Sequence, residues 1–538
     1  MAGSGQPGTT EKTAKRPAVR PDEEPFHRLK LITIVKGAGV SLGGGLFGRA
    51  LSYAFNLYAA KAIGLQGFGL FTLALTILRY VSIGTEGGQS SAVVHYVSIY
   101  RARNEPARVK GTILLSLRVV AGLSLLVALA LVLASDLLAT SVFHRPELAM
   151  PLIYVAISIP FSAVSTVLLR ATVGLQTMKF QVLTQDIFRP TIALVLLGSF
   201  LFYDFRLQAL ILAYVLAAIA EAVIAYLFFA RAFQHIIFSP LFPSQEARRV
   251  QPIFSRKAMQ AFSLPLFTSR LFGRLLKQAD HLILSFFVPM RELGLYSILH
   301  KTAFALIEIP SSLMEVLGPL VSRSSSEGDL SKLERQIQVA SKWIFALCFP
   351  VILFILLHPA AVLRVLGEQF VAGTTSFVIL CLGAFFAFSS GPTAMALTMS
   401  GNTTVTMVNT IGLGLTSLVL YAILIPQFGV QGAAISFAVS SAAVSVARIT
   451  EAWWVLQVRP WSKELLKPAG GAIAALLLTL LLEPLLPANK YLFLGLGLAL
   501  YLVVYLAFLL LLGLDAEDRF ILRKVRERLV PMPQQEEV

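Results

Sequence analysis

The sequence predicts an all-α polytopic membrane protein with about fourteen transmembrane helices. Its 538 residues are 56% hydrophobic and 14% charged, and the mean hydropathy is +0.75. An ordinary soluble domain has about 25% charged residues. Apolar segments near the roughly 20 residues that cross a bilayer as a helix recur along nearly the whole chain. They leave no stretch long enough for a sizeable soluble domain.

Fourteen apolar segments are expected to span the membrane, and the first would serve as the insertion signal. Residues 1–30 are rich in Gly, Pro, Thr and Lys and lack the apolar core of a signal peptide, so we expect a disordered basic cytoplasmic tail. Cys348 and Cys381 both lie in apolar segments, which argues against a disulfide framework or a cysteine metal site. The predicted spans are residues 33–60, 68–96, 110–134, 147–172, 181–203, 207–232, 259–288, 294–321, 336–358, 372–398, 403–426, 431–456, 466–483 and 491–514.

The distribution of Lys and Arg predicts how these spans are oriented. A net charge of +16 would suggest nucleic-acid binding in a soluble protein, but most basic residues outside the spans lie in the termini and in alternate connections. Cytoplasmic segments of membrane proteins carry such an excess, so both termini are predicted to be cytoplasmic and no nucleic-acid partner is expected. Six basic residues fall on the opposite side: Lys61, Arg145, Arg206, Arg291, Arg364 and Lys490.

The chain repeats itself. The tetrapeptide LFGR at residues 46–49 recurs at 271–274, 225 positions later. Nine of the 26 residues in 46–71 are identical to their counterparts in 271–296. Each unit would hold six spans, an even number, so both would enter the membrane in the same orientation. We expect two parallel repeats related by an axis along the membrane normal.

This repeat gives the predicted domain organisation. Residues 31–235 would form an N-terminal six-helix bundle, 236–258 a cytoplasmic linker and 259–457 a C-terminal six-helix bundle. Two additional transmembrane helices in 464–514 have no counterpart, and 515–538 would be a basic cytoplasmic tail.

Glycines in the first span point to close helix packing. The stretch GVSLGGGLFGRA has the glycine spacing of a phosphate-binding loop, but Arg49 and Ala50 stand where that loop needs Lys and Ser or Thr. Small residues instead recur every three or four positions, which leaves one helix face nearly bare for a neighbouring helix. These residues are Gly37, Ser41, Gly44, Gly48 and Ser52.

Basic residues inside the spans indicate a function or a partner, because a charge facing lipid is unfavourable by several kcal/mol. Arg118 and Lys342 lie near cytoplasmic ends and can extend to water, and Arg189 has Asp186 three positions away on the same helix face. The ten residues are Arg49, Arg79, Arg118, Arg189, Arg270, Arg274, Lys277, Lys301, Lys342 and Arg448.

Four spans predict an electropositive, water-filled cavity between the two bundles. The seventh span carries a basic stripe of Arg270, Arg274, Lys277 and His281, which fall within about 60° of one another at 100° per residue. The first span holds two repeat equivalents, Arg49 for Arg274 and Asn56 for His281. The second span has a polar face with Arg79, Glu86 and Ser90, and the eighth has one with Lys301, Glu308 and Glu315. Alternatively, the stripe pairs with acids of adjacent helices such as Asp280, Glu308 or Glu221. The candidate substrate-binding residues are Arg49, Asn56, Arg79, Arg270, Arg274, Lys277, His281 and Lys301.

A basic cavity suits an anionic passenger, because guanidinium groups bind phosphate through paired donors. Acidic residues in the same helices could hold a proton or a sodium ion that resets the cycle, or could serve only as ion-pair partners. These coupling-ion candidates are Glu86, Asp280 and Glu308.

Several segments together resemble the bacterial polysaccharide flippases of the multidrug/oligosaccharidyl-lipid/polysaccharide exporter superfamily. They are LSYAFNLYAAKAIGLQGFGLFTLAL, GGQSSAVVHYVSIYRARNEPARVKG, LRATVGLQTMKF and SGNTTVTMVNTIGLGLTSLVLYAILIPQFGVQGAAISFAVS. The resemblance covers roughly residues 31–460. It implies two six-helix bundles in a V-shaped arrangement and alternating access around a central cavity.

The resemblance also implies a substrate and a role for the basic residues. The substrate would be an undecaprenyl-diphosphate-linked oligosaccharide, moved from the cytoplasmic to the outer leaflet of the bacterial inner membrane. Basic residues on the matching helices would hold the diphosphate: Arg49, Arg79, Arg270, Arg274 and Lys301. A polysaccharide polymerase and glycosyltransferases are the expected protein partners.

Other functions stay open at this point. A multidrug antiporter of the same superfamily would export organic cations and should have an acidic or aromatic cavity. A non-transporting scaffold would recruit glycan-assembly enzymes through its basic loops, and another flippase would carry a different lipid or a peptidoglycan precursor. The sequence contains no nucleotide loop and no His/Cys/Asp metal spacing, so we expect neither an enzyme nor a metal or cofactor.

Overall fold

The fold is helical, as the bilayer requires, because backbone groups in lipid have no water to bond and are satisfied within helices. Ten helices of the described part of the chain are long and apolar enough to cross a membrane. The predicted all-α polytopic fold is therefore confirmed. The computed structural model describes residues 24–86, 88–202, 206–237, 279–327, 329–485, 489–513 and 519.

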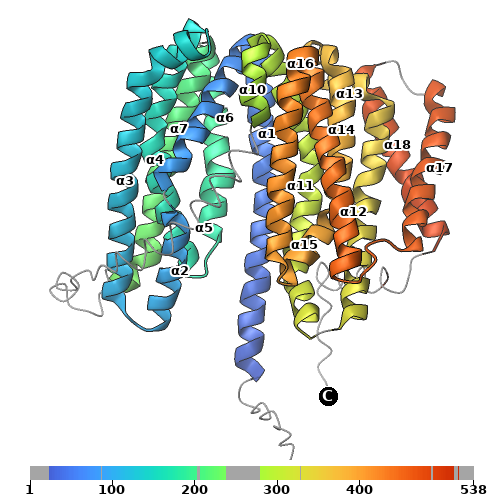
Figure 1. Ribbon diagram of the computed structural model, residues 1–538, viewed down its shortest axis with the longest axis horizontal. Coiled ribbons are helices and arrows are strands. Elements are labelled where there is room, and N and C mark those ends of the chain that lie inside the picture. Colours follow the sequence, from blue (N-terminus) through green and yellow to red (C-terminus); the bar gives the residue numbers. More distant parts are fainter. Residues whose placement is uncertain are drawn as a thin grey trace, which may run out of the picture.

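The helices of the N-terminal half lie together at the left of Figure 1, with α1 at the centre of the molecule. Short 3-10 and π-helical segments connect several of them. In order they are α1 (Glu24–Glu86), α2 (Gln89–Ala102), α3 (Pro106–Leu137), η2 (Leu138–Val142), η3 (Pro146–Leu148), α4 (Ala149–Gly174), α5 (Lys179–Gln181), η4 (Val182–Phe188), α6 (Arg189–Leu201) and α7 (Arg206–Ile237).

The C-terminal half lies to the right of α1, with α17 and α18 at its outer edge (Figure 1). Tyr505 of α18 donates a hydrogen bond to the Ala346 carbonyl of α12 (2.8 Å), which joins these two extra helices to the half. The elements are α10 (Ala279–Phe287), α11 (Met290–Ser326), α12 (Leu330–Leu357), α13 (Pro359–Leu366), η5 (Glu368–Gly373), α14 (Thr374–Ser389), α15 (Gly391–Met399), α16 (Thr403–Val455), η6 (Lys463–Leu465), α17 (Leu466–Leu482), η7 (Glu483–Leu485) and α18 (Lys490–Leu511).

Two long helices each contain a sharp break at a glycine. Gly64 in α1 has φ 83° and ψ 163°, and Gly429 in α16 has φ 54° and ψ −125°, so neither backbone is helical there. A positive φ is easily adopted only by glycine. Both breaks fall at predicted boundaries between spans, and α1 and α16 therefore each supply two membrane passes.

Element boundaries in the two halves recur at the spacing found in the sequence. Helix α4 begins at Ala149 and α14 begins at Thr374, 225 residues later. The break at Gly64 likewise corresponds to Pro289, which separates α10 from α11. These boundaries support two parallel six-helix repeats, whose symmetry relation stays a prediction.

The second predicted span does not continue as one helix. Helix α1 ends at Glu86, and α2 begins at Gln89 after Gly88, whose φ is 75°. The predicted polar face that placed Glu86 and Ser90 on one helix is therefore wrong. The equivalent region of the other half runs unbroken through α11 to Ser326. The sequence Gly87-Gly88 accounts for the difference, because the equivalent positions of the second half are Ser312 and Leu313.

The halves touch most closely where α1 crosses α11. A Cβ atom on Gly69 would overlap the Met290 carbonyl oxygen, and one on Gly294 would overlap the Leu65 carbonyl oxygen. Gly69 and Gly294 are equivalent positions of the two repeats, so each glycine receives the backbone of the other half. We call this contact the glycine crossing.

Further contacts join the halves at the same end of the molecule. Arg145 donates to the Val288 carbonyl (3.2 Å), and the rings of Phe143 and Phe286 stack with centroids 4.8 Å apart. By the predicted topology this end is extracytoplasmic, because α1 begins at the opposite end (Figure 1).

The glycines of the first span pack as predicted. Gly48 is buried against η4, and a Cβ atom there would overlap the backbone of Asp186. A Cβ atom on Gly44 would lie 2.6 Å from Cγ1 of Val182. Any larger side chain would push α1 away from η4.

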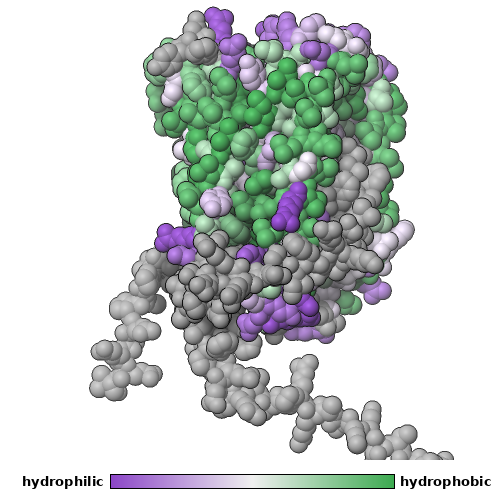
Figure 2. Space-filling view, turned by 90° about the vertical axis from the view of Figure 1, so that its left-hand side faces the viewer, coloured by the Kyte–Doolittle hydropathy of each residue, from purple (hydrophilic) through white to green (hydrophobic). Residues whose placement is uncertain are grey.

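The outer surface is apolar between polar ends, as expected of a protein that faces lipid. Figure 2 shows this belt over the N-terminal half, with hydrophilic residues gathered above and below it. Leu125, Leu129 and Leu133 of α3 are among the large hydrophobic side chains that it exposes.

Candidate functional site

A cavity of about 520 Å³ lies within the N-terminal half, beside α1. Its volume is in the range of small-molecule binding sites. Polar side chains of α1, α4, η4, α6 and α7 line it together with apolar ones. The polar lining consists of Ser52, Asn56, Arg79, Tyr80, Ser82, Ser158, Ser162, Gln185, Arg189 and Tyr214.

Arg79 carries a positive charge that a ligand in the cavity can reach. It follows the Gly64 break on α1, and its side chain is exposed within this cavity. Among the described side chains it makes no ion pair or hydrogen bond, and its electrostatic neighbours are Arg189, Lys301 and Tyr214. Lys301 adds a second positive charge beside Arg79, so the region favours an anion.

Arg189 is neutralised within the protein. Its guanidinium lies 2.7 Å from Oε2 of Glu221 on α7 and packs over the Tyr214 ring at 5.1 Å. The other Glu221 oxygen accepts hydrogen bonds from Ser165 (2.7 Å) and Gln185 (3.3 Å). We call these residues the Glu221 network.

The partner of Arg189 differs from the one that the sequence predicts. Asp186 was the expected acid, since it lies three positions earlier, but its segment η4 is π-helical and packs against Gly48 of α1. A wider helical turn changes which residues share a face. The acid that pairs with Arg189 therefore comes from α7, and this expectation was wrong.

Two predicted binding residues from opposite halves meet at the cavity. Lys301 of α11 donates a hydrogen bond to Oδ1 of Asn56, which lines the cavity. The next residue, Thr302, hydrogen-bonds Tyr53 of α1 at 2.8 Å. The Lys301 ammonium also lies 5.2 Å from the Phe68 ring centroid. We call these two interhelical hydrogen bonds the α1–α11 latch.

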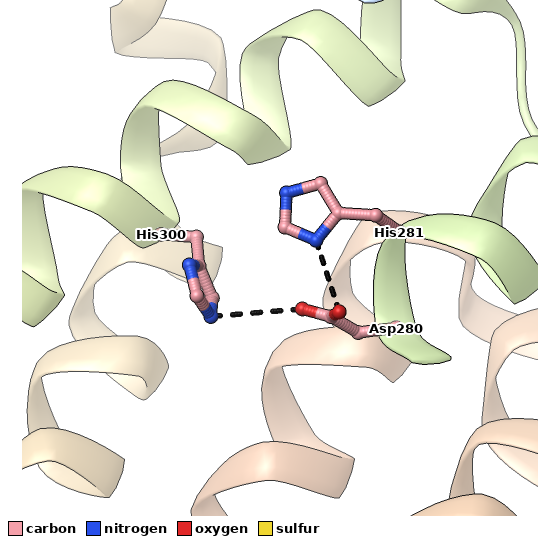
Figure 3. Close-up of side chains that lie close together, drawn as sticks. All are labelled: Asp280, His281 and His300. Carbon is pink, nitrogen blue, oxygen red and sulfur yellow. Dashed lines mark ion pairs between the residues drawn. The ribbon is translucent and has the colours of Figure 1, made fainter. Parts of the chain in front are cut away.

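One titratable cluster lies beside this latch, between α10 and α11. Figure 3 shows Asp280 and His281 of α10 pointing toward His300 of α11. Nδ1 of His281 is 2.9 Å from Oδ1 of Asp280, and Nε2 of His300 is 3.6 Å from Oδ2. Tyr296 donates a hydrogen bond to Oδ2 at 2.9 Å. We call Asp280, His281, Tyr296 and His300 the α10–α11 cluster.

The remaining predicted site residues fall elsewhere. Arg49 is exposed on α1 and is not part of the cavity lining. His281 faces Asp280 and is likewise absent from that lining. The other predicted site residues lie outside the described residues or side chains: Arg270, Arg274, Lys277, Glu86 and Glu308.

Sequence reasoning missed several cavity residues. Gln185, Tyr80 and Tyr214 carry no periodic signal, because they reach the cavity from three different elements. Glu221 was noted only as an alternative partner for the basic stripe. An acid in the middle of an apolar helix was the one signal that could have revealed its network.

The fold and the cavity together define a class: a multi-pass membrane transporter with two helical halves. Residues 34–325, more than half of the chain, match the family described as Polysaccharide biosynthesis protein, and the chain belongs to that family. The predicted resemblance to polysaccharide flippases of the exporter superfamily is thereby confirmed.

A curated relative and solved structures agree with this assignment. Stage V sporulation protein B of Bacillus subtilis (strain 168) is 23% identical over 323 residues, which cover 58% of this chain and 62% of that protein. The match therefore spans less than two thirds of the relative. Lipid II flippase MurJ, in an inward closed conformation, superposes with a TM-score of 0.67 at 17% identity, covering 86% of this chain and 96% of that one.

A MOP superfamily transporter from Pyrococcus furiosus Vc1 gives a TM-score of 0.55 at 13% identity, covering 78% of this chain and 96% of that one. At these identities the structural similarities establish the common fold.

Proposed function

We propose that this protein flips an undecaprenyl-diphosphate-linked oligosaccharide from the cytoplasmic to the outer leaflet of a bacterial inner membrane. The observation that carries the proposal is Arg79, a guanidinium exposed in a membrane cavity with cationic neighbours. Membership of the Polysaccharide biosynthesis protein family supports a substrate from glycan assembly.

The cavity chemistry divides naturally between the two parts of such a headgroup. Arg79 would bind the diphosphate, since a guanidinium offers paired donors to phosphate oxygens. Gln185, Ser158 and Ser162 would hydrogen-bond sugar hydroxyls, and Tyr214 offers an aromatic surface. The polyprenyl chain would stay in the surrounding lipid, because its transfer into a polar cavity is unfavourable.

Transport requires two conformations that bind the headgroup differently. The glycine crossing and the contacts at Arg145 join the halves at one end. With the predicted topology, both termini are cytoplasmic and this joined end faces outward, so the cavity would load from the cytoplasmic side. Opening of the joined end would then release the substrate into the outer leaflet.

The coupling ion would act in the C-terminal half. Asp280 is the coupling-ion candidate whose side chain is described, and it lies beside the latch that joins α11 to α1. Glu86 and Glu308 stay candidates for the same role, and Arg49, Arg270, Arg274 and Lys277 stay candidates for substrate contacts. A polymerase and glycosyltransferases would receive and supply the glycan.

Two other functions are less well supported. An organic cation would be repelled by Arg79 and Lys301, which argues against a multidrug antiporter. A non-transporting scaffold would have no need of a charged cavity.

Arg79→Gln tests the proposal. Loss of a charged hydrogen bond is worth about 1.5–3 kcal/mol, so flipping should fall by about 10- to 100-fold. Lipid-linked glycan should then accumulate in the cytoplasmic leaflet of cells that depend on this protein. Arg79→Lys, which keeps the charge without the paired donors, should retain partial activity.

Arg108→Gln is the matched control, since this arginine is exposed at the start of α3 and pairs with Glu105. Its flipping activity should equal that of the wild type. Normal glycan export by a folded Arg79→Gln variant would refute the diphosphate role. A loss of export by the control alone would instead favour the scaffold function.

A further inference from the structure

The α10–α11 cluster buries one carboxylate between two imidazoles. Nδ1 of His281 lies 2.9 Å from Oδ1 of Asp280, and Nε2 of His300 lies 3.6 Å from Oδ2. An ionised carboxylate that is buried in this way is unfavourable unless a cation or hydrogen-bond donors compensate it. A proton on the cluster would supply that compensation.

Charge counting identifies which cation fits. With neutral imidazoles and an ionised Asp280, the cluster carries one negative charge. One proton brings it to zero, whereas a divalent ion would leave a net positive charge beside Lys301, the residue after His300. Sodium is also a poor match, because hard cations prefer oxygen ligands and two of the facing atoms are imidazole nitrogens.

Three consecutive residues of α11 connect this cluster to the other half. His300 faces Asp280, Lys301 bonds Asn56 of α1, and Thr302 bonds Tyr53 of α1. Any movement of His300 relative to α10 therefore changes the α1–α11 latch. Phe304 stacks on His300 with ring centroids 4.0 Å apart and restricts the imidazole to this position.

We propose that the α10–α11 cluster binds a single proton and that His300, Lys301 and Thr302 transmit its presence to the α1–α11 latch. The inference rests on the proposed alternation between two conformations and adds the identity of the coupling cation. Protonation neutralises Asp280 and favours the packing of α10 against α11 described here. Deprotonation leaves a buried, uncompensated carboxylate and favours a conformation in which water reaches the cluster.

Other titratable groups surround the cluster and have to be separated from it. Tyr80 of α1 and Tyr421 of α16 interact electrostatically with Asp280, and Arg79 of α1 interacts with Lys301. Ordinary tyrosine and arginine side chains titrate at about pH 10 or above, so they do not respond near neutrality. Lys301 is the nearest amine, and Asp280→Asn separates it from the cluster because that variant keeps Lys301.

The test measures conformation directly, in lipid nanodiscs without any glycan lipid. Spin labels on Arg103→Cys and Leu330→Cys report the distance between the halves at the end where α1 begins, with Cys348 and Cys381 replaced by alanine. Both label positions are exposed. As pH rises from about 5.5 to about 8.5, the described conformation should be depleted, and its ratio to the alternative should change by up to about tenfold per pH unit for one proton.

Two sets of variants should abolish this response in opposite directions. Asp280→Asn removes the charge and should hold the described conformation at every pH. The double variant His281→Gln with His300→Gln keeps the charge without a titrating imidazole and should deplete that conformation at every pH. The distant His95→Gln should keep the wild-type response.

Several results would overturn the proposal. They are a wild type that does not respond to pH, a response to sodium or zinc chloride at constant pH, and retention of the wild-type response by either cluster variant. If one cluster variant fails to fold, the other still decides. Because no substrate is present, failure of the glycan-export assay leaves this outcome intact, and the converse also holds.

Discussion

The Glu221 network should stabilise the fold, and Glu221→Gln tests this role separately from transport. The change removes the carboxylate that lies 2.7 Å from the Arg189 guanidinium. Removing one partner of a buried ion pair is unfavourable by about 3–5 kcal/mol. Arg189 keeps 24% of its side-chain surface exposed, whereas Glu221 keeps 1%. Water in the cavity can therefore hydrate the orphaned guanidinium, and a loss near about 3 kcal/mol is expected.

Two buried thiols supply the assay for this prediction. Cys348 and Cys381 are free and buried, so a thiol-reactive dye reports unfolding as they become accessible. For a chain of this size we expect about 2 °C per kcal/mol, which places the Tm of Glu221→Gln about 5 °C below that of the wild type.

A double variant and a control sharpen the result. Combining Arg189→Met with Glu221→Leu removes both charges, and it should melt closer to the wild type than Glu221→Gln does. Glu327→Gln breaks an exposed pair with Lys332 and should leave Tm unchanged. If Glu221→Gln melts with the wild type, or if the double variant melts lowest, the ion pair does not stabilise the fold as reasoned here.

Two further predictions concern the joint between the halves and the seventh span. Gly69→Ala and Gly294→Ala each place a methyl group into the backbone of the opposite half, so both should lower the folded yield on size-exclusion chromatography. Gly84→Ala, which has open space around its Cβ position, should keep the wild-type yield. Equal yields for all three variants would mean that the glycine crossing is not tight. Replacing both Arg270 and Arg274 with Gln should cause lipid-linked glycan to accumulate on the cytoplasmic leaflet while the protein stays folded and inserted, and normal export by that variant would exclude these arginines from diphosphate binding.

The fold was predictable from sequence because the membrane leaves few alternatives. Apolar length selects helices, and the glycine breaks fell where the spans were expected to change direction, at Gly64 and Gly429. The interruption between Glu86 and Gln89 was missed, because a window of about 20 residues averages the polar stretch TEGGQSS at 85–91 with the apolar segments on either side. A hydropathy pattern detects the end of a membrane pass, but it does not detect a break within one.

The site was predictable in part. Arg79 and Asn56 of α1 both line the cavity of the N-terminal half, whereas the sequence predicted a cavity between the two bundles, and their role in binding stays a prediction. The partner of Arg189 was not predicted, since the pairing depends on how η4 turns and on which face of α7 meets it. Periodicity predicts the face of one helix, whereas an ion pair between two helices depends on their rotation and register.

The contacts between the halves suggest where the motion of transport is concentrated. At the glycine crossing the two backbones touch with no side chain between them, so this contact permits rotation but little separation. The latch lies farther from that end and consists of two hydrogen bonds that a small rotation would break. A pivot at Gly69 and Gly294 would therefore open the latch before the crossing yields. His300 of the α10–α11 cluster directly precedes the latch residue Lys301, so the protonation proposed above would act next to the contact that has to open.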